Sequence, residues 1–202
     1  MKRSLLFGTI LASVVALAPA AATAGQGAGG CQLDGNATFD KPLTTASVTT
    51  GYSFAGTLSN CDGTYADKGG AVSAGRTITI GGVAYQPLDQ PSLTGGCSNS
   101  TTSGTAFVDW GAGKYSAIKY TTSGAAALVT LTGTFQKSVV LSSVAVDPVT
   151  GQHTTLALSD LAYGGDSAGG PLAFQPADPT ACAGAGVATA GIHGAIAHGN
   201  DS

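Results

Sequence analysis

The chain has 202 residues, only 9% of them charged, and a formal net charge of −3. All 11 acidic residues are Asp, so mechanisms that need a catalytic glutamate are excluded. Eight Lys and Arg residues form no basic patch, which argues against nucleic-acid binding. A chain of this length is long enough for one domain with a sizeable core.

The N-terminus has the pattern of a secretory signal peptide. Lys2 and Arg3 precede an apolar run from Leu5 to Ala18, and Ala22-Thr23-Ala24 fits a small-residue cleavage site. The apolar run is too short to span a bilayer, and no later segment is apolar enough to do so. We therefore expect a secreted protein, extracellular or associated with the envelope. The expected division is a cleaved signal over residues 1–24, a flexible leader over 25–30, one domain over 31–197 and a tail over 198–202.

Four cysteines, Cys31, Cys61, Cys97 and Cys182, lie in the expected mature chain. An even number of cysteines in an oxidising compartment predicts two disulfides. Three pairings are possible, and the sequence alone does not choose among them. We expect Cys61–Cys97, which would close a local loop, and Cys31–Cys182, which would join the first strand to the last. No pair has the C-x-x-C spacing of a zinc or redox site.

Short runs rich in Thr and Val alternate with Gly, Asn and Pro along the rest of the chain, which predicts strands separated by turns. The predicted strands lie in Thr44–Leu58, Arg76–Ile80, Gly104–Trp110, Lys114–Thr121, Ala126–Phe135, Val139–Val146, Thr154–Tyr163 and Gly186–Ala197.

No segment shows a sustained helical period, so the fold class is all-β. About eight or nine short strands favour one immunoglobulin-like or related β-sandwich. In Leu128–Phe135 one face carries Thr hydroxyls and the other is apolar, and Gly133 marks a possible bulge. We expect residues 166–185, rich in Gly, Pro and Ala, to form a long loop, or a strand only around Leu172–Phe174.

The segment Gly165–Leu172 reads GDSAGGPL and resembles the sequence around the nucleophile of trypsin-like serine proteases, with one Ala inserted. That chemistry needs a Ser, a His and an Asp in one constellation. The only upstream histidine, His153, lies 14 residues before Ser167 in a turn. We therefore interpret the segment as a Gly-rich loop. A small serine hydrolase using Ser167 with Asp166 or Asp160 is kept as an alternative.

The sequence indicates no metal site or cofactor. His193 and His198 are separated by an odd number of residues, so a strand would place them on opposite faces. The region between Asp160 and Asp166 offers two carboxylates, but calcium needs several converging oxygen ligands, and no recognised loop spacing is present.

Aromatic residues gather in the hairpin that contains Trp110, Tyr115 and Tyr120. Exposed aromatic faces stack on sugar rings, so these three residues are the candidate ligand-binding residues. A single Trp at the end of an apolar strand is also typical of a buried core. The sequence is compatible with both roles.

Several short motifs resemble, as a set, a group of secreted proteins from high-GC Gram-positive (actinobacterial) bacteria for which we know of no activity. These are Phe39–Thr44 (FDKPLT), Ser59–Thr64 (SNCDGT), Gly95–Cys97, Gly104–Trp110, Leu131–Phe135, and Cys182 followed by Gly186–Gly191. The resemblance implies an exported, disulfide-bonded β-sandwich and no particular activity.

The function expected from these observations is non-enzymatic: an extracellular or cell-envelope binding or structural module. Its partner would be a cell-wall glycan or another extracellular protein. Besides the serine hydrolase, a secreted protease inhibitor that presents a loop near Cys97 or Cys182 is the other alternative.

Overall fold

The computed structural model describes residues 29–62 and 69–199. The expected signal peptide and residues 25–28 of the expected leader therefore lie outside the described residues, and the last two leader residues, Gly29 and Gly30, belong to the first strand. The described elements are β1 (Gly29–Leu43), β2 (Val48–Asp62), β3 (Gly70–Ala74), β4 (Ile78–Ile80), β5 (Val83–Tyr85), β6 (Ser92–Gly95), β7 (Asn99–Gly111), β8 (Lys114–Ala125), β9 (Leu128–Phe135), β10 (Ser138–Val146), β11 (His153–Ser159), β12 (Ser167–Pro176), the 3-10 turn η2 (Ala181–Ala183) and β13 (Val187–Gly199).

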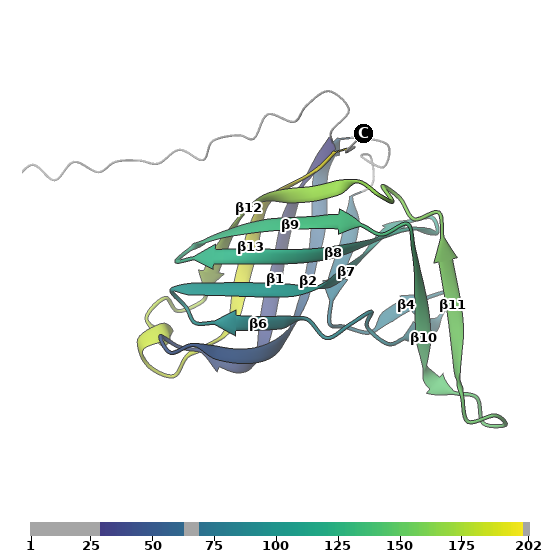
Figure 1. Ribbon diagram of the computed structural model, residues 1–202, viewed down its shortest axis with the longest axis horizontal. Coiled ribbons are helices and arrows are strands. Elements are labelled where there is room, and N and C mark those ends of the chain that lie inside the picture. The colour runs from purple at the N-terminus through teal and green to yellow at the C-terminus, as the bar shows by residue number, and fades with distance from the viewer. Residues whose placement is uncertain (1–28, 63–68, 200–202) are drawn as a thin grey trace, which may run out of the picture.

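The main sheet closes on itself into a barrel (Figure 1). Its order is β1-β13-β12-β9-β8-β7-β3-β2, and β2 pairs again with β1. The short strands β3 and β6 share one position between β2 and β7. The Val48–Gly51 part of β2 pairs with β6, and the Phe54–Leu58 part pairs with β3. The barrel therefore has eight strand positions.

The all-β class and the two disulfides are confirmed, but the fold is a closed barrel with a second sheet rather than a clear immunoglobulin-like sandwich. Strands that alternate apolar and polar residues suit both architectures. The difference lies in the antiparallel pairing of β1 with β13 and with β2, which removes the free edges that a sandwich would keep. That pairing joins segments from the two ends of the chain, and local periodicity carries no information about it.

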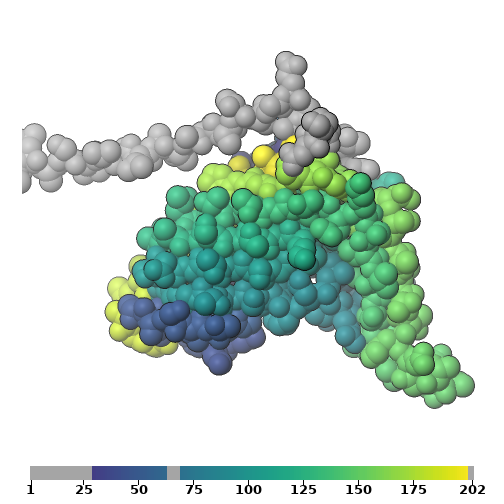
Figure 2. All heavy atoms as spheres, in the orientation of Figure 1, coloured from purple at the N-terminus to yellow at the C-terminus, as the bar shows by residue number. Residues whose placement is uncertain are grey.

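The second sheet has four strands in the order β11-β10-β5-β4 and covers part of the outer wall of the barrel. Phe107 of β7 points outward and packs against Ile78, Tyr85 and Leu141 of this sheet. The β10–β11 hairpin extends beyond the barrel as a separate arm (Figures 1 and 2). Val149, near its tip, is 90% exposed.

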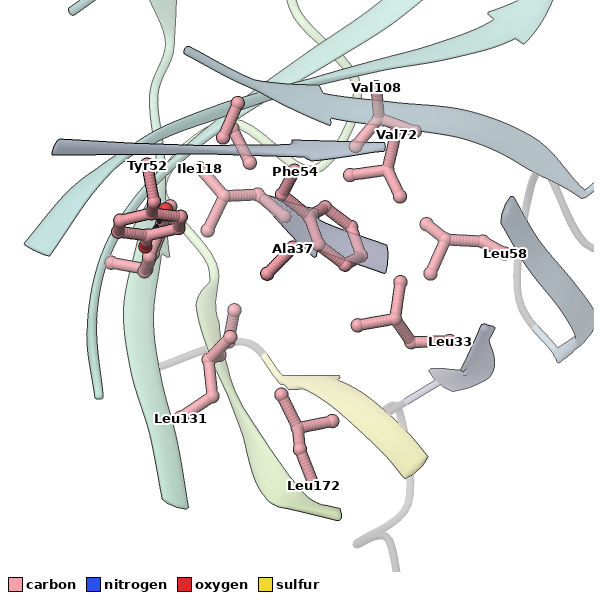
Figure 3. Packing of buried hydrophobic residues seen from close by; sticks show 14 of the residues in the cluster. Leu33, Ala37, Tyr52, Phe54, Leu58, Val72, Val108, Ile118, Leu131 and Leu172 are labelled. Atoms are coloured by element: carbon pink, nitrogen blue, oxygen red, sulfur yellow. Dashed lines mark hydrogen bonds between the residues drawn. The ribbon is translucent and has the colours of Figure 1, made fainter. Parts of the chain in front are cut away.

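Side chains that point into the barrel form the main core. Burial alternates along β1, so that Leu33, Ala37 and Phe39 point inward while Asp34, Asn36 and Thr38 face solvent. The same alternation places Phe54 of β2 and Ile118 of β8 inside. Figure 3 shows such residues converging from several strands on the barrel interior.

The outer face of the barrel carries hydroxyl groups where the alternation predicted them. Thr121 and Thr132, which are paired across β8 and β9, are both exposed, with their hydroxyl oxygens 3.1 Å apart. Thr49 and Thr94 make the same kind of pair across β2 and β6, at 3.2 Å. The register of β8 and β9 is continuous through Gly133, so the bulge expected there does not form.

The expected disulfide pairing was wrong. Cys31 pairs with Cys61, and Cys97 pairs with Cys182. Because β1 and β2 are neighbours in the barrel, the Cα atoms of Cys31 and Cys61 are only 4.1 Å apart. The second disulfide joins the β6–β7 connection to η2, and the backbone N–H of Thr45 donates to the carbonyl of Cys182 nearby.

The strand expected only around Leu172–Phe174 is longer than predicted, and the loop covers only residues 177–186, which include η2. Ser167–Pro176 forms β12, which lies between β9 and β13 in the barrel wall. Gly170 lies where a Cβ atom would come within 2.0 Å of the carbonyl oxygen of Ala195. The glycines of this segment therefore permit close packing of neighbouring backbones, rather than a loop.

Candidate functional site

The interior of the barrel contains a cavity of about 130 Å³. Side chains from every strand position of the barrel line it, and most are aliphatic or aromatic. An eight-stranded barrel is just wide enough either to be filled by its side chains or to hold one small ligand. Small inward residues, including Ala37, Ala74 and Ala106, leave the space that larger residues would fill.

A group of hydroxyls interrupts the apolar lining toward the end of the barrel where the Cys97–Cys182 disulfide lies. The hydroxyls of Tyr52 and Tyr120 share one hydrogen bond, in which either can be the donor. The hydroxyl of Thr102 also hydrogen-bonds to that of Tyr52, and it lies 2.8 Å from the hydroxyl of Thr122. These four side chains all line the cavity and are called here the hydroxyl cluster.

Burial gives this cluster its electrostatic character. Tyr52 and Tyr120 are only 6% and 8% exposed, and this desolvation raises the pKa of both phenols above the ordinary value of 10.0. The negative charge of Asp89 raises both pKa values further. Both groups therefore stay neutral around pH 7 and offer hydrogen bonds rather than charge.

Aromatic rings fill the opposite end of the barrel. Trp110 is 4% exposed, and its indole N–H donates to the hydroxyl of Ser116 at 2.8 Å. Ser116 in turn donates to the carbonyl of Ala162, also at 2.8 Å. Tyr163 packs edge-on against Trp110, with ring centroids 5.7 Å apart. This network fixes the wall of the cavity at that end.

His198 also lines the cavity at this end. Its ring lies 4.1 Å from that of Tyr163, centroid to centroid, and 6.2 Å from that of Phe135. Both ring nitrogens are buried, and neither has a hydrogen-bond partner among the described residues. Nδ1 lies 3.6 Å from a carboxylate oxygen of Asp166.

The three aromatic residues predicted to bind a ligand do not form one exposed platform. Trp110 and Tyr120 point into the barrel and line the cavity. Tyr115 points to the outside, where its ring stacks on Phe107 at 5.4 Å beneath the second sheet. Sequence reasoning found two of the lining aromatics but missed Tyr52. The sequence did contain a signal for Tyr52, because it is separated by an even number of residues from the apolar Phe54 and Leu58 and so lies on the same, inner face of the strand.

The structure does not bring Ser167 and the histidines together as a nucleophile and its base. Ser167 pairs with Gly199 and donates its hydroxyl hydrogen to that carbonyl at 3.3 Å. The next residue, Ala168, pairs with His198. Ser167 and His198 therefore lie on opposite faces of the barrel wall.

His193 lies on the outer face, as its odd separation from His198 predicts, and its Nδ1 is 3.1 Å from Asp34. In residues 29–62 and 69–199, no three His, Cys or Asp side chains lie close enough to hold a metal ion. Cys97 and Cys182, near the loops considered for an inhibitor, are joined at one end of the barrel.

Comparisons with family models, curated proteins and solved structures find no match to this chain. Within the described part of the chain, no helix is long and apolar enough to cross a membrane.

Proposed function

We propose that the protein is a secreted, non-enzymatic binding protein whose barrel holds one small, uncharged and largely apolar molecule. The observation that carries this proposal is the cavity of about 130 Å³ with a predominantly apolar lining. Secretion is supported by the signal-like N-terminus and by two disulfides, which persist in oxidising compartments.

The size of the cavity limits the ligand. Protein interiors are close-packed, with few voids larger than a water molecule. An engineered apolar cavity of about 150 Å³ stays dry and binds benzene. The cavity here is slightly smaller, so it suits a single ring of five or six atoms, or a short branched chain.

The lining also limits the charge of the ligand. Transfer of an isolated ion from water into such an interior costs far more than one hydrogen bond returns. Neither a Lys nor an Arg lines the cavity to pair with an anion, and the one imidazole there, that of His198, already lies 3.6 Å from the carboxylate of Asp166. The ligand is therefore uncharged.

Benzene is the probe for the first experiment, and Trp110 is the reporter, because it is the only tryptophan of the chain and lines the cavity. Titration of the oxidised protein should change the Trp110 emission saturably, and calorimetry should give the same Kd. Ala74→Leu on β3 places three more carbons in the cavity and should abolish binding. Ala71→Leu, at an exposed position of the same strand, should bind as the wild type does.

Filling a cavity commonly raises stability by about 0.5–2 kcal/mol, so unfolding of Ala74→Leu is not expected to explain its loss of binding. Thermal unfolding of both variants checks this point. The proposal fails if benzene does not bind the wild type, or if a folded Ala74→Leu binds it unchanged.

A further inference from the structure

His198 of β13 brings a polar ring into the largely apolar cavity. It lines the cavity at the aromatic end, and its side chain is only 12% exposed. Both ring nitrogens are buried, and neither is hydrogen-bonded to any of the residues 29–62 and 69–199. A buried polar atom without a partner is costly, and native proteins rarely leave one. These nitrogens therefore mark the place where the cavity offers a hydrogen bond to a ligand.

The neighbours of His198 hold its ring in place. Tyr163 packs on it with ring centroids 4.1 Å apart, and Phe135 lies edge-on at 6.2 Å. Gly29 is the partner of His198 on the neighbouring strand β1. A Cβ atom at position 29 would come within 2.4 Å of Nε2, so a side chain there would collide with the ring. The imidazole thus lies between two aromatic rings and a bare backbone, and these surroundings give its nitrogens no hydrogen bond.

A neighbouring carboxylate decides which nitrogen of His198 accepts a hydrogen bond. Nδ1 lies 3.6 Å from a carboxylate oxygen of Asp166. The negative charge favours the proton on the nitrogen that faces it, because it attracts the N–H dipole. A neutral imidazole has one N–H donor and one acceptor nitrogen, so Nε2 is the acceptor. The group that satisfies Nε2 must therefore be a hydrogen-bond donor.

We infer that the ligand of the cavity carries one hydroxyl group, which donates its hydrogen to Nε2 of His198, while the apolar body of the ligand fills the rest of the space. This inference rests on the proposed function and adds the class of ligand: small phenols and small cyclic or branched alcohols. The hydroxyl cluster at the other end of the cavity competes less well for this group, because its hydroxyls already pair with one another.

The test compares phenol with toluene, which have nearly the same shape and differ by a hydroxyl in place of a methyl group. Both Kd values are measured by calorimetry on the oxidised wild-type protein and on three variants. His198→Phe keeps an aromatic ring and removes both nitrogens, whereas His198→Gln supplies an amide oxygen as an acceptor. His193→Phe is the matched control, because His193 lies on the same strand but on the outer face, beside Asp34.

The preference is the ratio of the toluene Kd to the phenol Kd. It should fall about fivefold in His198→Phe, which is the value of one neutral hydrogen bond, and should not change in His193→Phe. His198→Gln should restore part of it. The hydration of each probe is the same in every titration, so it cancels when two proteins are compared. In nitrogen NMR spectra of the wild type, phenol should move the resonance of the unprotonated His198 nitrogen upfield, and toluene should not.

The outcomes separate the inference from the proposed function. If the ratio is the same in His198→Phe as in the wild type, or falls equally in His193→Phe, the role of His198 is overturned and the apolar cavity remains. An unchanged His198 resonance on phenol binding overturns it as well. If neither probe binds the wild type, the proposed function itself fails. If His198→Phe does not fold, the NMR shift in the wild type decides.

Discussion

Replacing Ser116 by Ala tests how the barrel interior is held together at its aromatic end. Ser116 lies on β8 and is fully buried. Its hydroxyl accepts from the indole of Trp110 and donates to the carbonyl of Ala162, each at 2.8 Å. It thereby joins β7, β8 and the turn after β11.

The expected loss of stability follows from what the substitution leaves behind. The Ala162 carbonyl loses a donor and the Trp110 indole loses an acceptor, both in the interior. A buried group deprived of its partner costs about 1–3 kcal/mol, so the free energy of unfolding should fall by about 3 kcal/mol. For a domain of this size the Tm should drop by roughly 6–12 °C.

Urea unfolding of the oxidised protein, followed by Trp110 fluorescence, measures the effect. Ser123→Ala is the matched control, because Ser123 is exposed on the same strand and should change the unfolding free energy by less than about 0.5 kcal/mol. A loss below about 1 kcal/mol in Ser116→Ala would refute the reasoning, because it would mean that water or a rearranged backbone satisfies the two groups.

Three further predictions concern other parts of the barrel. Replacing Cys97 and Cys182 by Ala should lower the free energy of unfolding by about 4.6 kcal/mol, from the chain-entropy relation for a separation of 85 residues. Loss of the Cys31–Cys61 disulfide, with a separation of 30, should cost about 1 kcal/mol less. The opposite order in urea unfolding would contradict this prediction. Burial raises the pKa of Tyr52 and Tyr120, so their contribution to stability is complete below pH 10 and falls as the pH rises above it. Because the folded wild type keeps both phenols protonated, Tyr52→Phe/Tyr120→Phe should show the same phenolate absorbance as the wild type at about pH 10.5. A smaller absorbance in the variant would refute their burial. Thr180 donates two hydrogen bonds to the Asp178 carboxylate and lowers its pKa below 3.8. These hydrogen bonds therefore contribute to stability at neutral pH, and the contribution is lost as the pH falls through the lowered pKa. An NMR titration that gives Asp178 a pKa of 3.8 or above would contradict this prediction.

The strands could be predicted from the sequence because their signal is local. The alternation in Leu128–Phe135 places the Thr residues outside and Leu131 and Phe135 inside, as β9 does. The length of β12 was underestimated because the Gly and Pro content of this segment outweighs its short apolar run. Its position comes from pairing with β9 and β13, which strand propensity does not register.

The candidate site could be predicted only in fragments. Parity along each strand places Trp110, Tyr120 and Tyr52 on the inner face, but whether that face is filled or leaves a void depends on how the eight strand positions meet. The disulfide pairing depends on the same contacts between distant segments. Cys31 and Cys61 meet because β1 and β2 are neighbours, a fact that the spacing of the cysteines does not contain.

The pairing of the first strand with the last has a consequence for how the chain reaches its folded state. Gly29 is the partner of His198, and Cys31 is the partner of Ile196, so the barrel stays an open trough until β13 has been added. Contacts between residues so far apart in sequence form slowly, and apolar surface remains exposed until they do. A chain that lacks β13 therefore cannot form the closed barrel, and the inner face of its sheet stays exposed to solvent. We expect removal of β13 to leave an aggregating chain rather than a smaller stable domain, which would show as insoluble product under conditions where the full chain refolds.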